Sequence, residues 1–278
     1  MLIVFGRAFP FAIANITELA LVNLPVLLVS ALVADRVAVA QWGLTRVIAN
    51  LVRGLCLQLA VPLAAELGHD YAIGDRARLS RLYARGSVFV TVLASLIVAG
   101  LLPFWGDFFV LWTHGSIPYD APLAIVLLLG SAAAAPSLLA LAFATHSNRG
   151  DLLIRSKGLQ LVVFLVLSIV LTRWLGPLGA ALAVVASDIL VQFGLLAFVV
   201  MGQALEHPVR HTAFLVLVSV LIVLSGWGAG LIATLLAPGT GLVHFLAECA
   251  VWLVFAAVAA SPLIVKGFRE TLMSTIPR

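Results

Sequence analysis

Charged residues are scarce in this sequence. Asp, Glu, Lys and Arg make up 10% of its 278 positions, whereas about a quarter of an ordinary soluble domain is charged. Hydrophobic residues fill 63% of the chain, and the mean hydropathy is +1.18. A water-soluble fold cannot hide that much apolar surface in its interior, so the composition excludes a soluble globular domain and predicts a protein embedded in lipid.

Cysteine and enzymatic motifs are also lacking. The two cysteines, Cys56 and Cys249, both lie inside apolar runs, and a disulfide framework or a thiolate metal site needs a larger, regularly spaced set. The sequence contains no GxSxG, no phosphate-binding Walker loop and no obvious group of histidines and carboxylates. We therefore expect no enzymatic activity, no catalytic residue, no metal and no cofactor.

Long apolar runs dominate what is present. A helix needs about 20 apolar residues to cross the hydrocarbon of a bilayer. About eight runs reach this length, and they predict an all-α, polytopic helical membrane protein with about eight transmembrane helices. The runs cover residues 10–33, 37–65, 86–112, 121–145, 155–174, 178–202, 212–236 and 242–265.

Basic residues gather in the breaks between these runs. The net charge of +4 therefore indicates membrane orientation rather than nucleic-acid binding, which we do not expect. Only Arg36 and Arg173 fall on one side of an eight-helix arrangement, so the opposite side and both termini are predicted to be cytoplasmic. That basic side carries Arg7, Arg76, Arg78, Arg81, Arg85, Arg149, Arg155, Lys157, Arg210, Lys266, Arg269 and Arg278.

Several charged and polar residues lie inside the runs, where each charge costs about 2.5–3.5 kcal/mol on insertion scales. Arg46, Asn50 and Arg53 in the second run are spaced i, i+4, i+7 and share one helix face. The first run carries Glu18. Because consecutive spans are antiparallel, Glu18 and Arg53 fall at similar depth, and an ion pair between them is geometrically feasible.

This polar face has two interpretations. In the first, it lines a cavity in which Arg46 or Arg53 binds a phosphate, because a guanidinium stays charged and matches phosphate oxygens bidentately. In the second, a structural bridge between Glu18 and an arginine joins neighbouring helices. The first is favoured for Arg46, which has no evident partner, and the second for Arg53.

Two further polar pairs occur at i, i+4 spacing. Asp188 and Gln192 lie in the sixth run and form a candidate ion-coupling site, since intramembrane carboxylates often relay protons. A carboxylate hydrogen-bonded to a neighbouring helix is the favoured alternative. His244 and Glu248 lie in the last run, which is expected to be peripheral, so a packing role is favoured for them.

Three segments resemble a known family when they are taken in order. The second run ends at Pro62, is followed by charged residues, and leads to the Leu-Tyr-x-Arg segment at 82–85. The stretches NRGDLLIRSK (148–157) and LGPLGAALA (175–183) come next. Over about residues 9–205 this order is similar to the C-terminal half of polysaccharide flippases, in the multidrug/oligosaccharidyl-lipid/polysaccharide exporter superfamily.

The resemblance implies two six-helix lobes around a central cavity, often with two appended helices. Residues 1–206 would then form one lobe, and residues 207–278 two additional helices and a cytoplasmic tail. It also implies alternating-access transport of a lipid-pyrophosphate-linked oligosaccharide across a bacterial inner membrane, in polysaccharide or lipopolysaccharide biosynthesis. Arg46 and Arg53 occupy the helix whose arginines would contact the pyrophosphate, with Asn50 and Glu18 on the same substrate-binding face.

About eight helices are fewer than two lobes require. The expected partners are therefore membrane lipid, the lipid-linked oligosaccharide, and a second wall supplied by a missing N-terminal lobe, a homodimer or a polysaccharide-synthesis complex. Two other functions stay open. One is a non-transporting assembly subunit or truncated remnant of such a transporter, and the other is a cation-coupled multidrug exporter using Asp188 or Glu18.

Overall fold

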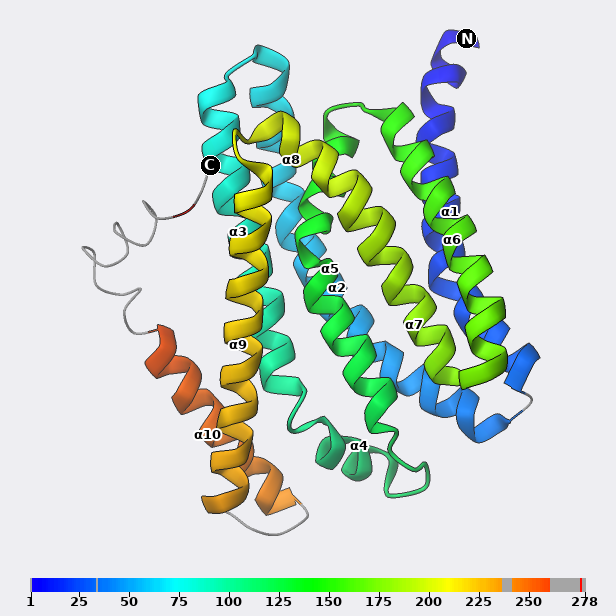
Figure 1. The fold of residues 1–278 in the computed structure, drawn as a ribbon, viewed down its shortest axis with the longest axis vertical. Coiled ribbons are helices and arrows are strands. Elements are labelled where there is room, and N and C mark those ends of the chain that lie inside the picture. Colours follow the sequence, from blue (N-terminus) through cyan, green and yellow to red (C-terminus); the bar gives the residue numbers. More distant parts are fainter. Residues whose placement is uncertain (1, 34, 237–241, 261–275, 277–278) are drawn as a thin grey trace.

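The computed structural model describes residues 2–33, 35–236, 242–260 and 276, and the described chain is helical throughout its regular structure (Figure 1). The all-α fold class is confirmed. The elements are α1 (Leu2–Val33), α2 (Arg36–Ile73), α3 (Arg76–Leu101), α4 (Trp105–Thr113), α5 (Ala121–His146), α6 (Gly150–Leu175), α7 (Pro177–Ser187), the π-helical η1 (Asp188–Ala197), α8 (Phe198–Ala204), α9 (Pro208–Leu236) and α10 (Leu242–Ala260).

Seven of the expected spans are present as helices long and apolar enough to cross a membrane. They are α1, α2, α3, α5, α6, the continuous run from α7 through η1 to α8, and α9. The eighth is shorter within the described residues, where its apolar part is Leu242–Val258. The chain is therefore a multi-pass helical membrane protein.

Successive connections between the spans lie at opposite ends of the bundle. The prediction that the basic connections share one side requires this arrangement. Figure 1 places the N-terminus and the connections near residues 74, 148 and 206 at one end, with α4 at the other. These are the connections in which the basic residues gather. Which end faces the cytoplasm stays a prediction, and Lys266, Arg269 and Arg278 lie outside the described residues.

The arginine-rich stretch 66–85 separates the second and third spans as expected, but it is mostly helical and not a loop. Helix α2 continues to Ile73, and α3 begins only three residues later. Gly74 adopts φ +78° and donates its N–H to carbonyls of the last turn, while the Asp75 carboxylate accepts from the Arg78 amide and caps α3. At about 1.5 Å per residue α2 is about 57 Å long, so this polar hairpin extends beyond the hydrocarbon.

The third span ends earlier than the expected 86–112, so the C-terminal end of that prediction is wrong. Helix α3 ends at Leu101, and α4 is a separate nine-residue helix. Pro103 lies between them and has no amide hydrogen to continue the helix. In α4 the rings of Trp105, Phe108 and Trp112 lie against one another, with centroids 5.2–6.3 Å apart. Such an aromatic cluster suits a membrane–water interface.

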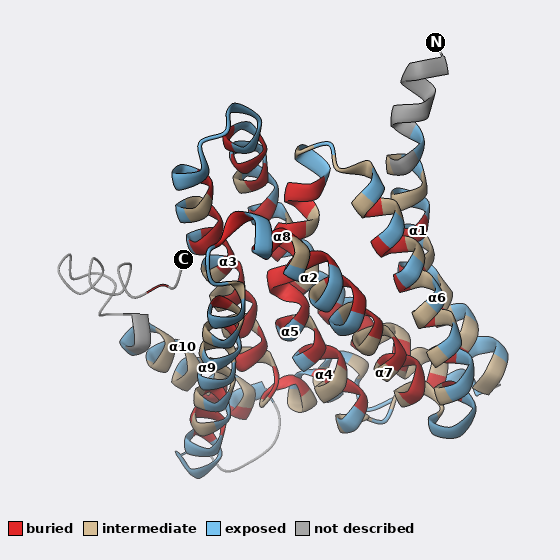
Figure 2. Cartoon of the chain, turned by 45° about the horizontal axis from the view of Figure 1, so that its top comes forward, coloured by how far each residue is buried: buried red, intermediate tan, exposed pale blue. Residues whose placement is uncertain are grey.

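Helix α5 forms the centre of the bundle and packs against α2, α3, α7 and η1. In its most apolar segment 72% of the residues are buried, compared with 22% for α9. Figure 2 shows the same contrast, because α5 is largely buried whereas α9 presents an exposed surface. The exposed side chains on α9 include Leu221, Leu224 and Leu231. Apolar side chains therefore face outward, where lipid replaces water as the solvent.

The hairpin from α6 into α7 is closely packed. Gly179 permits the close contact, since a Cβ atom there would lie 2.1 Å from the Leu171 carbonyl oxygen. Helix α7 then widens into the π-helical η1, which begins at Asp188. A π-helical segment shifts side chains around the helix axis relative to a regular α-helix, and such segments are frequent at functional sites.

Candidate functional site: a charged cavity inside the bundle

Glu18 on α1 joins three helices through its two carboxylate oxygens. Oε1 accepts from Arg53 Nη2 on α2 at 2.6 Å, and Oε2 accepts from Lys157 Nζ on α6 at 2.5 Å. Lys157 is only 2% exposed, whereas Glu18 and Arg53 are 33% and 25% exposed. The antiparallel geometry expected from the sequence therefore does bring Glu18 and Arg53 into an ion pair.

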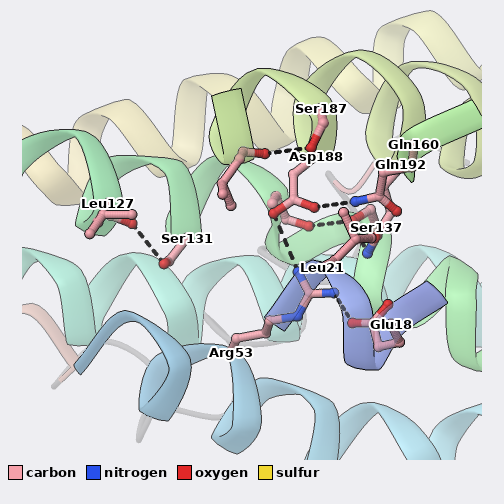
Figure 3. Close-up of polar contacts among 12 residues, drawn as sticks. Glu18, Leu21, Arg53, Leu127, Ser131, Ser137, Gln160, Ser187, Asp188 and Gln192 are labelled. Carbon is pink, nitrogen blue, oxygen red and sulfur yellow. Dashed lines mark hydrogen bonds and ion pairs between the residues drawn. The ribbon is translucent and has the colours of Figure 1, made fainter. Parts of the chain in front are cut away.

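Asp188 forms the second acidic contact. Its Oδ2 lies 3.4 Å from Arg53 Nη1, and its Oδ1 accepts from Gln160 Nε2 at 2.6 Å. Figure 3 shows Arg53 extending between Glu18 on one side and Asp188 on the other. The Arg53 guanidinium is thus held by two carboxylates from different helices. This is the hydrogen-bonded arrangement that the sequence analysis favoured for Asp188.

Lys157 completes the network. Besides Glu18, its ammonium donates to Gln160 Oε1 at 3.1 Å and to Gln192 Oε1 at 2.8 Å. Gln192 in turn donates to the Ser137 hydroxyl at 3.1 Å, one residue beyond Pro136 in the central helix. Polar contacts therefore connect α1, α2, α5, α6 and η1, and buried charges are tolerated because each is hydrogen-bonded and paired.

Arg46 differs from the other cations. It is 8% exposed, and its Nη2 donates to the Leu21 carbonyl at 2.9 Å while its guanidinium carbon lies 5.6 Å from the centre of the Trp42 ring. Its Nη1 is buried without a hydrogen-bond partner, and no carboxylate of the described chain lies within 4.0 Å of it. The side chain is therefore oriented by its neighbours, and among the described residues it forms no direct ion pair.

Several of these residues line a small cavity of about 60 Å³ between α1, α2, α5, α6 and α7. Its wall includes Glu18, Arg46, Asn50, Arg53 and Asp188, whereas the facing part of α5 contributes Gly130, Ser131 and Ala134. Asn50 is exposed, and its amide is available to a ligand in the cavity.

The formal charges of the residues that line the cavity cancel, but their pairing is uneven. Arg46 and Arg53 carry two positive charges, and Glu18 and Asp188 carry two negative ones. Both carboxylates are bound directly to Arg53 or to the neighbouring Lys157, whereas Arg46 forms no direct ion pair with a described carboxylate. An anion is the species that this arrangement is suited to receive.

The sequence analysis missed part of this network. Lys157 was counted as a basic residue of a cytoplasmic connection, which is wrong because α6 begins at Gly150 rather than near 155 and places Lys157 two turns inside the helix. Gln160 and Ser137 were not singled out either. The spacing of Lys157 and Gln160, three residues apart on one face of an apolar helix, was the available signal. Substrate-binding roles for Glu18, Arg46, Asn50 and Arg53, and ion coupling by Asp188 and Gln192, stay predictions.

Together these features define a polytopic helical membrane protein with a charged cavity between its helices. The fold matches a solved structure described as "Lipid II flippase MurJ, inward closed conformation", with a TM-score of 0.66 and 15% sequence identity. The match covers 92% of this chain and 53% of the flippase. At this identity it establishes the fold alone. The resemblance expected from the sequence is confirmed at that level.

This chain spans about half the length of the flippase that it matches. No family model matches the sequence, and no curated protein matches it.

Proposed function

We propose that this chain is one lobe of a flippase that carries a lipid-pyrophosphate-linked oligosaccharide across a bacterial inner membrane by alternating access. The single observation behind this proposal is Arg46, a buried cation that lines the cavity without a carboxylate partner. Flipping requires no bond chemistry, but it does require the charged head group to cross about 30 Å of hydrocarbon in a polar groove.

The surroundings of Arg46 suit a pyrophosphate contact. Its contacts with the Leu21 carbonyl and the Trp42 ring fix the guanidinium, so less side-chain entropy is lost when an anion binds. Arg53 is instead held by Glu18 and Asp188. We assign the first phosphate contact to Arg46 and a supporting, charge-balancing role to Arg53, with Asn50 as a neutral donor in the same cavity.

The contacts of the two carboxylates argue against a cation-coupled drug exporter. Such a protein needs an acidic group that a cation or cationic drug can reach. Glu18 is bound by Arg53 and Lys157, and Asp188 by Arg53 and Gln160.

The fold match covers 53% of the flippase, and we propose that a second lobe completes the transport pathway here too. The cavity lies between helices of this chain, but Asn50 on α2 is exposed, and a polar group that faces lipid is costly. The second wall is either another copy of this chain or a separate lobe. Its helices would face α2 at the exposed Asn50.

The proposal is tested by flipping in proteoliposomes that contain the full chain and an undecaprenyl-pyrophosphate-linked oligosaccharide. Arg46→Ala is expected to abolish flipping without reducing membrane insertion. The exposed Arg81 provides the matched control, and Arg81→Ala should flip at the wild-type rate. Equal flipping by wild type and Arg46→Ala would remove the assignment. Absence of flipping by the wild type, with both candidate second walls supplied in turn, would favour the assembly-subunit or remnant alternative.

A further inference from the structure

A second group of ionisable side chains lies at the end of the bundle where α4 is found. His244 and Glu248 lie one turn apart on α10, and Asp107 on α4 reaches the same point from 137 positions earlier in the sequence. His244 Nε2 lies 3.2 Å from Glu248 Oε1 and 3.7 Å from Asp107 Oδ2. One nitrogen and two carboxylate oxygens, all within 4.8 Å of one another, therefore converge.

Burial makes this group unusual. The side chains of His244 and Glu248 are 8% and 2% exposed. Among the described residues, Glu248 Oε2 and His244 Nδ1 have no hydrogen-bond partner. A buried carboxylate oxygen without a partner is costly, and two neighbouring carboxylates repel each other unless a positive charge lies between them. Asp107 is 39% exposed, so the group is accessible from one side.

We propose that Asp107, His244 and Glu248 bind a divalent transition-metal ion of the zinc type. Three protein ligands from imidazole and carboxylates, with a fourth position left for water, form a common zinc arrangement. For metal–ligand bonds of about 2.0–2.1 Å, tetrahedral geometry separates the ligand atoms by about 3.3 Å. The observed separations of 3.2 and 3.7 Å lie on either side of this value.

The charge balance also fits. Two carboxylates carry two negative charges, which a divalent ion neutralises while the imidazole stays neutral. A proton on His244 would neutralise only one of them. The sequence alone predicted no metal, because Asp107 is remote from the other two residues and only the fold brings it close.

A metal here would fasten α10 to α4. Trp252 on α10 already packs against Gly100 of α3, where a Cβ atom would lie 2.4 Å from the indole nitrogen. Phe245 lies 5.7 Å from Phe108 of α4, measured between ring centroids. The proposed ion adds a third attachment beside these apolar contacts. It would act as a structural ion that holds α10, distant from the charged cavity.

The experiment uses the full chain, purified in detergent with any affinity tag removed. Equilibrium dialysis against Zn²⁺, with the bound metal quantified by mass spectrometry, should give one ion per chain. Co²⁺ in its place should show the visible bands of a tetrahedral N/O site. His244→Ala and Glu248→Gln should each weaken Zn²⁺ binding about 100-fold or more. The exposed His69 is the matched control, and His69→Ala should bind Zn²⁺ as the wild type does.

Thermal unfolding provides the second readout. Zn²⁺ should raise the Tm of the wild type and of His69→Ala, because a ligand that binds only the folded state stabilises it. The rise should vanish in His244→Ala. Asp107→Asn changes only the exposed ligand of the site. If the α10 variants fail to fold, the loss of the Zn²⁺-induced rise in Tm is measured in this variant instead. Zn²⁺ binding that is equal in all variants, or absent from the wild type, would overturn the proposal.

Discussion

Lys157 and Glu18 are separated by 139 positions in the sequence, yet the lysine ammonium lies 2.5 Å from a carboxylate oxygen of Glu18. The other oxygen of the same carboxylate is bound by Arg53. Glu18 therefore balances two cations contributed by two other helices, and one of these, Lys157, is almost fully buried. Loss of one member of such a group leaves uncompensated charge inside the bundle, which costs more than the loss of an exposed ion pair.

Replacing Glu18 by Gln should strongly destabilise the protein. The substitution keeps the size of the side chain but leaves Lys157 without a carboxylate, so the free energy of unfolding should fall by about 3 kcal/mol. Reversible denaturation in detergent measures it. Glu66→Gln removes an exposed ion pair to Arg78 and should cost less than about 1 kcal/mol. Equal effects of the two substitutions would contradict the structural role given to Glu18.

Replacing Asp188 by Asn should be milder. Arg53 keeps Glu18 as its partner, so we expect a loss of about 1–2 kcal/mol, comparable to one charged hydrogen bond. Transport should keep whatever dependence on ion gradients the wild type shows. Gradient-driven transport by the wild type that disappears in Asp188→Asn would instead assign ion coupling to this carboxylate, with Gln192 beside it.

Gly179 is expected to tolerate no side chain. A Cβ atom there would lie 2.1 Å from the Leu171 carbonyl oxygen, so Gly179→Ala has to separate α6 from α7 and should cost about 1–3 kcal/mol. Gly158 on α6 has nothing within 4 Å of its Cβ position and serves as the matched control. Gly158→Ala should be neutral or stabilising by up to about 1 kcal/mol. Thermal unfolding of the two variants and the wild type measures these effects. An unchanged Tm in Gly179→Ala would refute the close packing of α6 and α7.

Much of the fold was predictable because length and hydropathy determine membrane-spanning helices with few alternatives. The ends of the helices were less predictable. The charged residues at 66–85 indicated a non-helical connection. A helix that leaves the hydrocarbon can nevertheless continue in water when its end is capped, as Asp75 caps α3. Pro103 indicated the end of α3, but the residues around it are apolar and made the segment look like one continuous span.

Part of the site was predictable for a similar reason. Glu18 and Arg53 are charges inside apolar runs, and antiparallel helices place them at the same depth. Lys157 was missed because its helix begins earlier than its apolar run. Asp107 was missed because nothing in its local sequence indicates which distant helix it will meet. Contacts between helices that are not consecutive depend on packing, which a single sequence does not reveal.

The most direct test of the central claim is the binding of undecaprenyl pyrophosphate to the full chain in nanodiscs, compared with uncharged undecaprenol. We predict that the wild type prefers the pyrophosphate lipid, and that Arg46→Ala lowers its affinity about tenfold or more, since a charged bidentate contact is lost. Affinity for undecaprenol should be the same in both proteins. Equal affinity of wild type and Arg46→Ala for undecaprenyl pyrophosphate would contradict the account.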